Sequence, residues 1–222
     1  MIHYHGTPIT PRYKLQEMAG RHFCVSHADP RDLDVCLKIG QSVMLDNGAF
    51  SAFTKGKPID RKGYLAWLEP VLQHPHWAIV PDVIDGSVDQ QREGLKDWIY
   101  PKELSAPVWH LGLSIDYLLE LVDSWPKVCL GSSGLYWNVG NLVWKRRMDE
   151  VFDVLCKRRF LPWIHGLRML GQSDYPLASA DSTNVARNHS SCGIHPEMMA
   201  ARIDSVQPTK YKPSSQQNLF DV

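Results

Sequence analysis

The stretch SVMLDNGAF, residues 42–50, indicates most clearly how this chain folds. A solid apolar run ends at Asp46, and Asn47 and Gly48 follow as residues that accept the positive φ of a tight turn. Strands buried on both faces of a parallel sheet have this continuous apolar character. We therefore expect a buried strand whose carboxyl end presents the Asp46 side chain.

Seven further runs of this kind recur along the 222 residues, with helical or loop segments between them. Regular alternation of strands and helices predicts an α/β fold, and eight such units predict a compact (β/α)8 TIM barrel in a single domain. A doubly wound open sheet is the alternative that the same pattern allows. The predicted strands lie within residues 2–7, 22–27, 42–50, 76–84, 106–112, 127–133, 161–169 and 176–182.

Four segments between or after these strands have the apolar spacing of amphipathic helices. Asp60 and Ser114 stand where N-caps belong, and Pro196 stands at a first helical position. We expect the barrel to occupy residues 1–205 and residues 206–222 to form a flexible tail, since no Gly/Ser-rich or Pro-rich linker divides the chain. The predicted helices are residues 60–74, 114–125, 144–160 and 195–206.

Composition narrows the class of protein. The 24 basic and 24 acidic residues balance, so a polyanionic partner has to be met by a local patch. No apolar leader and no run of 18 apolar residues is present, which predicts a cytoplasmic protein without a membrane segment. The cysteines are scattered and lack C-x-C or C-x-x-C spacing, which argues against a disulfide framework and a cysteine zinc site; they are Cys24, Cys36, Cys129, Cys156 and Cys192.

A polar residue stands at the carboxyl end of every predicted strand. Because a barrel brings the carboxyl ends of its strands to one pocket, we expect these side chains to converge there. Two carboxylates in unlike environments suit a nucleophile and an acid/base group acting on a glycosidic carbon. The residues at the strand ends are His3, His5, His27, Asp46, Asp82, Asp85, His110, Ser132, Ser133, His165, Arg168 and Asp181.

Five motifs in order, MLDNGAF, VPDVIDG, VWHLG, VCLGSSG and ADSTNVARN, resemble the tRNA-guanine transglycosylase superfamily across most of residues 42–190. They are more similar to its phage and bacterial branch, the 7-deazaguanine DNA transglycosylases. The resemblance implies a TIM barrel without a cofactor that replaces guanine in a polynucleotide with a 7-deazaguanine base. It also implies a covalent intermediate between an aspartate and the sugar.

Carried over motif by motif, the resemblance makes Asp181 the nucleophile and Asp46 the proton shuttle. It places the base against Asp82 and against Gly131, Ser132 and Ser133 of the LGSSG turn. His110 stands where the family has a Q-G step. The chain also lacks the family's C-x-C-x-x-C zinc subdomain and has no room for tRNA-docking insertions, which favours DNA over tRNA.

Further groups are candidates for holding the substrate. Four side chains near the last two strand ends, His165, Arg168, Arg187 and Asn188, are predicted to bind substrate, with the arginines on phosphates. The basic clusters 145–147 and 157–159 either contact phosphates or form solvated helix faces. Aromatic residues either sandwich a flipped base or pack in the barrel; they are Trp109, Tyr136, Trp137 and Trp163.

The last residues have a separate character. QQNLF resembles the Q-x-x-L-F peptide by which bacterial replication proteins bind the sliding clamp, with Gln216, Leu219 and Phe220 as anchors. A plain tail is the alternative.

Two other functions remain open at this stage. His3, His5, His110, His165 and Asp181 are similar to the zinc cage of amidohydrolase-like barrels, which predicts a metal-dependent hydrolase. A non-catalytic DNA-associated or clamp-associated protein is the other, and in it Asp181 has no chemical task.

Overall fold

The chain forms a parallel barrel in a computed structural model, which describes residues 1–170, 172–208 and 211. All strand pairs are parallel, and the sheet runs in the order β5-β4-β3-β2-β1-β9-β8-β7-β6. The strands are β1 Ile2–Gly6, β2 His22–Ser26, β3 Ser42–Asp46, β4 Trp77–Ile79, β5 Ser105–Ala106, β6 Val108–His110, β7 Lys127–Gly131, β8 Trp163–Gly166 and β9 Ser179–Ser182.

The two edges of this sheet meet at Pro107. β5 and β6 are one extended segment, and Pro107 divides it because proline has no N–H to give to the ladder. The carbonyl of Pro107 still accepts a hydrogen bond from Cys129 at 2.8 Å, and that of Ala106 accepts one from Val80 at 2.9 Å. The predicted eight strands and the barrel are therefore confirmed.

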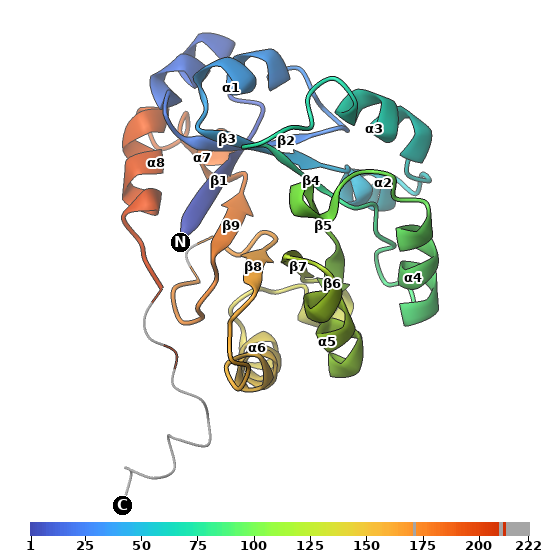
Figure 1. The fold of residues 1–222 in the computed structure, drawn as a ribbon. Helices are drawn as coiled ribbons and strands as arrows, with labels where there is room; N and C mark the ends of the chain where they lie inside the picture. The colour runs from blue at the N-terminus through green and yellow to red at the C-terminus, as the bar shows by residue number, and fades with distance from the viewer. Residues whose placement is uncertain (171, 209–210, 212–222) are drawn as a thin grey trace, which may run out of the picture.

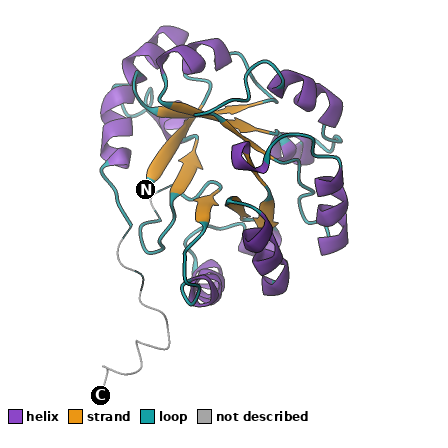
Figure 2. Cartoon of the chain, in the orientation of Figure 1, coloured by secondary structure: helices purple, strands orange, loops and turns teal. Residues whose placement is uncertain are grey.

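Helices lie around the outside of the strand ring (Figure 1), as the colouring by secondary structure also shows (Figure 2). Between β8 and β9 the described residues contain turns and no helix. The helices are η1 Arg12–Met18, α1 Leu33–Ile39, α2 Ala49–Thr54, α3 Arg61–Leu68, α4 Val88–Lys96, η2 Lys102–Leu104, α5 Ile115–Ser124, η3 Gly134–Tyr136, α6 Leu142–Leu155, α7 Asn184–Asn188 and α8 Pro196–Asp204.

The predicted helix starts are confirmed at α3, α5 and α8. The Asp60 carboxylate accepts from the Gly63 N–H at 2.9 Å, Ser114 caps α5 in the same way, and Pro196 is the first residue of α8. α3 ends at Leu68 instead of continuing to residue 74, since Pro70 follows its last turn. α6 begins at Leu142, two residues before the predicted start, because Asn141 provides its cap.

Apolar side chains fill the barrel and the space between strands and helices. An inner cluster contains Tyr4, Met44, Trp77, Ile79 and Val108, all at most 3 % exposed. Two outer clusters join the other face of the strands to the helices. The inner cluster fixes which residues point inward, because side chains alternate along each strand: Asp46 follows Met44 by two positions and His110 follows Val108 by two.

Candidate active site

Asp46 is the last residue of β3 and lies in a largely desolvated position at the mouth of the barrel. Gly48 takes φ 76°, as the sequence predicts, and its N–H donates to the Asp46 carboxylate at 3.1 Å. Burial raises the pKa of Asp46 to about 6, against lowering by a hydrogen bond from Ser26, and the charges of Asp181 and Asp82 raise it further. A carboxyl with a pKa near 6 exchanges protons readily at neutral pH.

Asp181 lies at the same mouth on β9, which is separated from β3 by β2 and β1 in the sheet. Its Oδ1 atom accepts from the backbone N–H of Arg168 at 3.0 Å and lies 3.3 Å from Nε2 of His165. Within the described part of the chain, no hydrogen bond to Oδ2 is found. Because the side chain is 12 % exposed, this second oxygen is the one available to a substrate.

Asp82 lies in the loop after β4 and is held by two neighbours. Its Oδ1 accepts from the Asn47 side chain at 2.9 Å, and its Oδ2 lies 2.8 Å from Nε2 of His110. Nδ1 of His110 faces the Ser133 hydroxyl at 3.4 Å. The structure thus joins three predicted residues into one polar row at the mouth, with Asn47 as an anchor that also donates to the Val80 carbonyl at 3.0 Å.

The turn after β7 supports this row. A Cβ at Gly131 would lie 2.8 Å from Nδ1 of His110, so glycine is needed for the imidazole to lie against β7. The Ser132 hydroxyl accepts from the Trp144 indole at 2.9 Å and is turned toward α6. Its carbonyl accepts from the Arg168 guanidinium at 2.8 Å, which ties the turn to the β8–β9 loop.

An aromatic pair lies at the rim of the mouth. Phe50 of α2 stacks on Trp137, which follows η3, with ring centroids 5.4 Å apart. The Arg168 guanidinium lies 4.4 Å from the Trp137 centroid and 4.9 Å from that of Phe50. Phe50 is 38 % exposed and Trp137 42 % exposed, so the pair offers flat apolar surface to a ligand.

The remaining predicted site residues have unequal positions. His165 is fully buried beneath Asp181 and has no surface on the mouth. Arg187 and Asn188 belong to the short helix α7 after β9; Arg187 is exposed and its charge is felt by Arg168.

The zinc cage suggested by the sequence is not assembled. His3 and His5 point outward from β1 to α8, where they lie 3.5 Å and 3.0 Å from Asp204, on the far side of the strand from Asp181. Arg21 adds a contact of 2.6 Å to the same carboxylate. The prediction that this histidine pair opens into the pocket is wrong, and no cluster of three potential metal ligands is found within residues 1–170 and 172–208 or at 211.

For three of the four aromatic residues, the structure shows packing, the second of the two alternatives. Trp109 faces outward from β6 and donates to the Ser114 carbonyl at 3.0 Å. Trp163 is the first residue of β8, at the end of the barrel opposite the mouth, and donates to the Ser179 hydroxyl. Tyr136 packs against the outer cluster beneath α6. Trp137 alone of these four residues stands exposed at the mouth.

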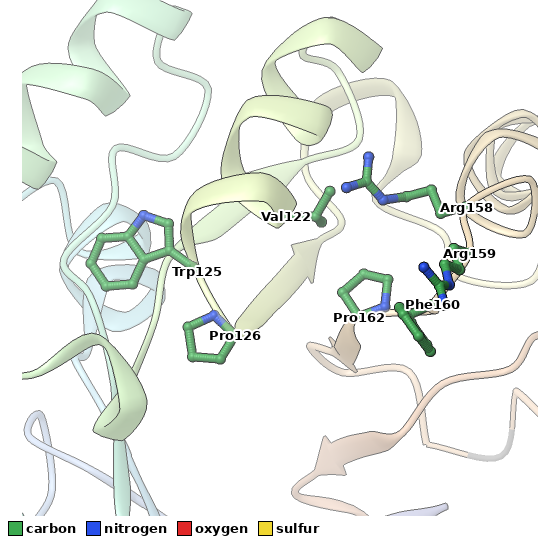
Figure 3. A pocket seen from close by; sticks show the side chains of 7 residues that line it. All are labelled: Val122, Trp125, Pro126, Arg158, Arg159, Phe160 and Pro162. Atoms are coloured by element: carbon green, nitrogen blue, oxygen red, sulfur yellow. The ribbon is translucent and has the colours of Figure 1, made fainter.

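One arginine from each basic cluster makes contacts within the protein. Arg147 donates to the carbonyls of Leu111 and Leu113 and is 15 % exposed. Arg158 pairs with Asp123. A pocket of about 520 Å³ lies where β7 and β8 begin (Figure 3), at the end of the barrel opposite Asp46 and Asp181; its walls are Val122, Trp125, Pro126, Arg158, Arg159, Phe160 and Pro162.

No protein-family model, curated protein or solved structure matches the chain. In the described part of the chain, no helix combines the length and the apolar character that crossing a bilayer requires. The predicted clamp contacts at Gln216, Leu219 and Phe220 lie outside the described residues.

Sequence reasoning missed Asn47 and Phe50 as parts of the site. The sequence pattern places Asn47 in a turn and gives no sign that its amide donates to the Asp82 carboxylate. Phe50 falls on the first turn of α2, where no apolar periodicity distinguishes a rim residue from a packed one.

Proposed function

We propose that this chain is a base-exchange transglycosylase that replaces guanine in DNA with a 7-deazaguanine base through a covalent aspartyl-sugar intermediate. One observation carries the proposal: Asp46 and Asp181 enter one barrel mouth in different environments. Asp46 is desolvated with a raised pKa, whereas Asp181 has one oxygen anchored and one free.

In the first half-reaction, Oδ2 of Asp181 attacks C1′ of the sugar. The bond from C1′ to the base breaks, its electron pair leaves with guanine, and the Asp46 carboxylic acid protonates the departing base. In the second half-reaction, the incoming base attacks C1′ and gives its proton to Asp46. The ester breaks and Asp181 is restored, so the enzyme ends in its starting protonation state.

The rim residues support recognition of a base outside the helical stack. C1′ of a stacked nucleotide cannot be approached by a side chain inside a barrel, so the target has to be flipped or single-stranded. Phe50 and Trp137 provide a stacking surface for it. Asp82, His110 and Ser133 present one carboxylate, one imidazole and one hydroxyl to the edge of a base.

The choice of DNA rests on the connections between the barrel elements. Within residues 1–170 and 172–208, the segments that join strands and helices hold no insertion large enough for a tRNA-docking module, which favours DNA. The test is an exchange assay in which DNA or tRNA is incubated with a 7-deazaguanine base and then digested to nucleosides for mass analysis. We expect the 7-deaza-2′-deoxyguanosine in the digest of the DNA sample. Incorporation into tRNA alone overturns the polymer assignment, and incorporation into neither polymer overturns the reaction.

A further inference from the structure

Beneath Asp181, a row of buried side chains continues down the inside of the barrel. The Trp163 indole donates to the Ser179 hydroxyl at 2.9 Å, and Ser179 Oγ lies 2.8 Å from Nδ1 of His165. Nε2 of His165 lies 3.3 Å from Oδ1 of Asp181. His165 and Ser179 are fully buried, so no water from the surface competes for these contacts.

The donors and acceptors of this row fix one tautomer of His165. Nε2 faces a carboxylate oxygen, which only accepts, so Nε2 has to carry a proton when the aspartate is ionised. Nδ1 of the neutral ring is then an acceptor, and the Ser179 hydroxyl supplies its proton to it. The Trp163 N–H only donates, and it satisfies the Ser179 oxygen from the other side.

We propose that His165 is a positioning residue that holds Asp181 ionised and orients it with Oδ2 toward the mouth. The proposal rests on the function proposed for Asp181 and extends it to a residue that does not touch the substrate. His165 and the Arg168 N–H both donate to Oδ1, so rotation of the carboxylate is restrained and its charge is stabilised from one side. Oδ2 is left for the sugar carbon.

The packing around His165 supports a fixed ring. Tyr4 and Trp77 meet the imidazole edge to face, with centroids 5.8 Å and 5.2 Å away. Tyr4 is also the register partner of Asp181 across β1 and β9. Because these two rings are only 2–3 % exposed, the imidazole cannot rotate to a second position without opening the barrel.

Several of the ionisable groups around Asp181 keep a constant charge over the pH range of the test. Burial raises the pKa of the Cys24 and Cys129 thiols well above their usual value, so both stay neutral between pH 4 and 8. Arg168 keeps its charge in that range. The groups that face Asp181 are His165 on β8, Cys24 on β2, Cys129 on β7, Asp46 on β3, Tyr4 on β1, and Arg168 in the β8–β9 loop.

The test uses nuclear magnetic resonance on the full chain without substrate. ¹⁵N shifts of the histidine rings identify the tautomer of His165, which is assigned by its loss in His165→Gln. ¹³C titration of the aspartate carboxyls follows Asp181, which is assigned through Asp181→Asn. We expect the Nε2–H tautomer in the wild type.

The variants separate the hydrogen bond from the volume of the ring. In His165→Phe the ring volume remains and the donor is lost, so we expect the protonated fraction of Asp181 at a fixed pH to rise roughly tenfold. His165→Gln places an amide donor near Nε2 and should stay within about threefold of the wild type. Ser179→Ala removes the donor to Nδ1 and should leave the Nε2–H tautomer in place, because the Asp181 carboxylate still requires a donor at Nε2.

Several results overturn the proposal. They are an Nδ1–H tautomer in the wild type, an unchanged Asp181 titration in folded His165→Phe, and a His165→Gln protein as perturbed as His165→Phe. If His165→Phe does not fold, the wild-type tautomer and Ser179→Ala decide the question. Failure of the wild type to exchange bases refutes the proposed reaction and leaves this measurement intact, so the two failures are distinguishable.

Discussion

The carboxylate of Asp181 acts on Asp46 across the mouth of the barrel. Burial is the main reason that the pKa of Asp46 rises to about 6, and the negative charge of Asp181 adds to it. Asp46 therefore ionises less readily while Asp181 carries its negative charge. In the proposed reaction, Asp181 is the anchored nucleophile and Asp46 is the group that carries the proton.

Replacing Asp46 by Asn should inactivate the protein and stabilise it. Between pH 3.8 and about 6 the unfolded chain is ionised at this position while the native state keeps its proton, so wild-type stability falls as pH rises through this window. Above pH 6, Asp46→Asn should therefore exceed the wild type by about 1–3 kcal/mol in free energy of unfolding. The difference should vanish below pH 4.

Urea titrations at pH 3.5, 5 and 8 measure this difference. Asp116→Asn, on the exposed side of α5, is the control and should show no such pH dependence. An Asp46→Asn protein less stable than the wild type at pH 8 contradicts the desolvation of this carboxyl.

Asp82→Asn should weaken recognition of the base more than it slows the chemistry. The asparagine amide cannot accept from both Asn47 and His110, so one buried donor loses its partner at a cost of about 1–3 kcal/mol. We expect the KM for the free base to rise roughly tenfold or more. Ser133→Ala, which removes only a contact of 3.4 Å, should change it less. An unchanged KM with a lowered kcat would instead place Asp82 in the chemical step.

Trp137→Ala and Phe50→Ala should reduce affinity for single-stranded DNA without unfolding the protein. Each ring is more than a third exposed, and loss of a base-stacking ring costs about 1–3 kcal/mol in binding. Fluorescence of 2-aminopurine at the target position reports the stacking directly. Phe160→Ala is the matched control, because this ring is 74 % exposed at the opposite end of the barrel. Equal losses in all three variants refute a stacking role for the rim pair.

Asp204→Asn should destabilise the junction of β1 with α8. Burial alone would raise the pKa of Asp204, but His3, His5 and Arg21 outweigh it and lower the pKa below its usual value. A depressed pKa means that this stabilisation is present above pH 3.8 and is lost as pH falls further. We expect a loss of about 1–3 kcal/mol at pH 7 by urea titration. Asp29→Asn, which breaks an exposed pair with Arg31, should cost less; the reverse order contradicts the role of Asp204.

The strands were predictable because their continuous apolar runs differ from the segments between them. Asp46 and Asp181 were predictable as acids at the carboxyl ends of two such runs. The direction in which His3 and His5 point was not predictable. Strands buried on both faces carry no alternation of polar and apolar residues. The pattern therefore does not tell which of two neighbouring residues points into the barrel and which points outward. The same ambiguity left both alternatives open for Trp109, which faces α5 while its neighbours Val108 and His110 face the barrel.

The rim of the mouth was least predictable because it is assembled from segments far apart in the sequence. Phe50, Trp137 and Arg168 follow three different strands, and only the closed barrel brings them together. Arg168 has a left-handed conformation, at φ 59°, which directs its N–H toward Asp181. Arginine has no preference for this conformation, so the sequence does not predict it.

The most direct test of the proposed reaction is denaturing mass spectrometry of the protein mixed with a guanine-containing DNA oligonucleotide in the absence of an incoming base. We predict a species whose mass equals the protein plus the oligonucleotide lacking one guanine, formed by the wild type and by Asp116→Asn and lost in Asp181→Asn. An adduct that persists in Asp181→Asn would contradict Asp181 as the nucleophile. Base exchange by a wild type that forms no adduct would contradict the covalent mechanism.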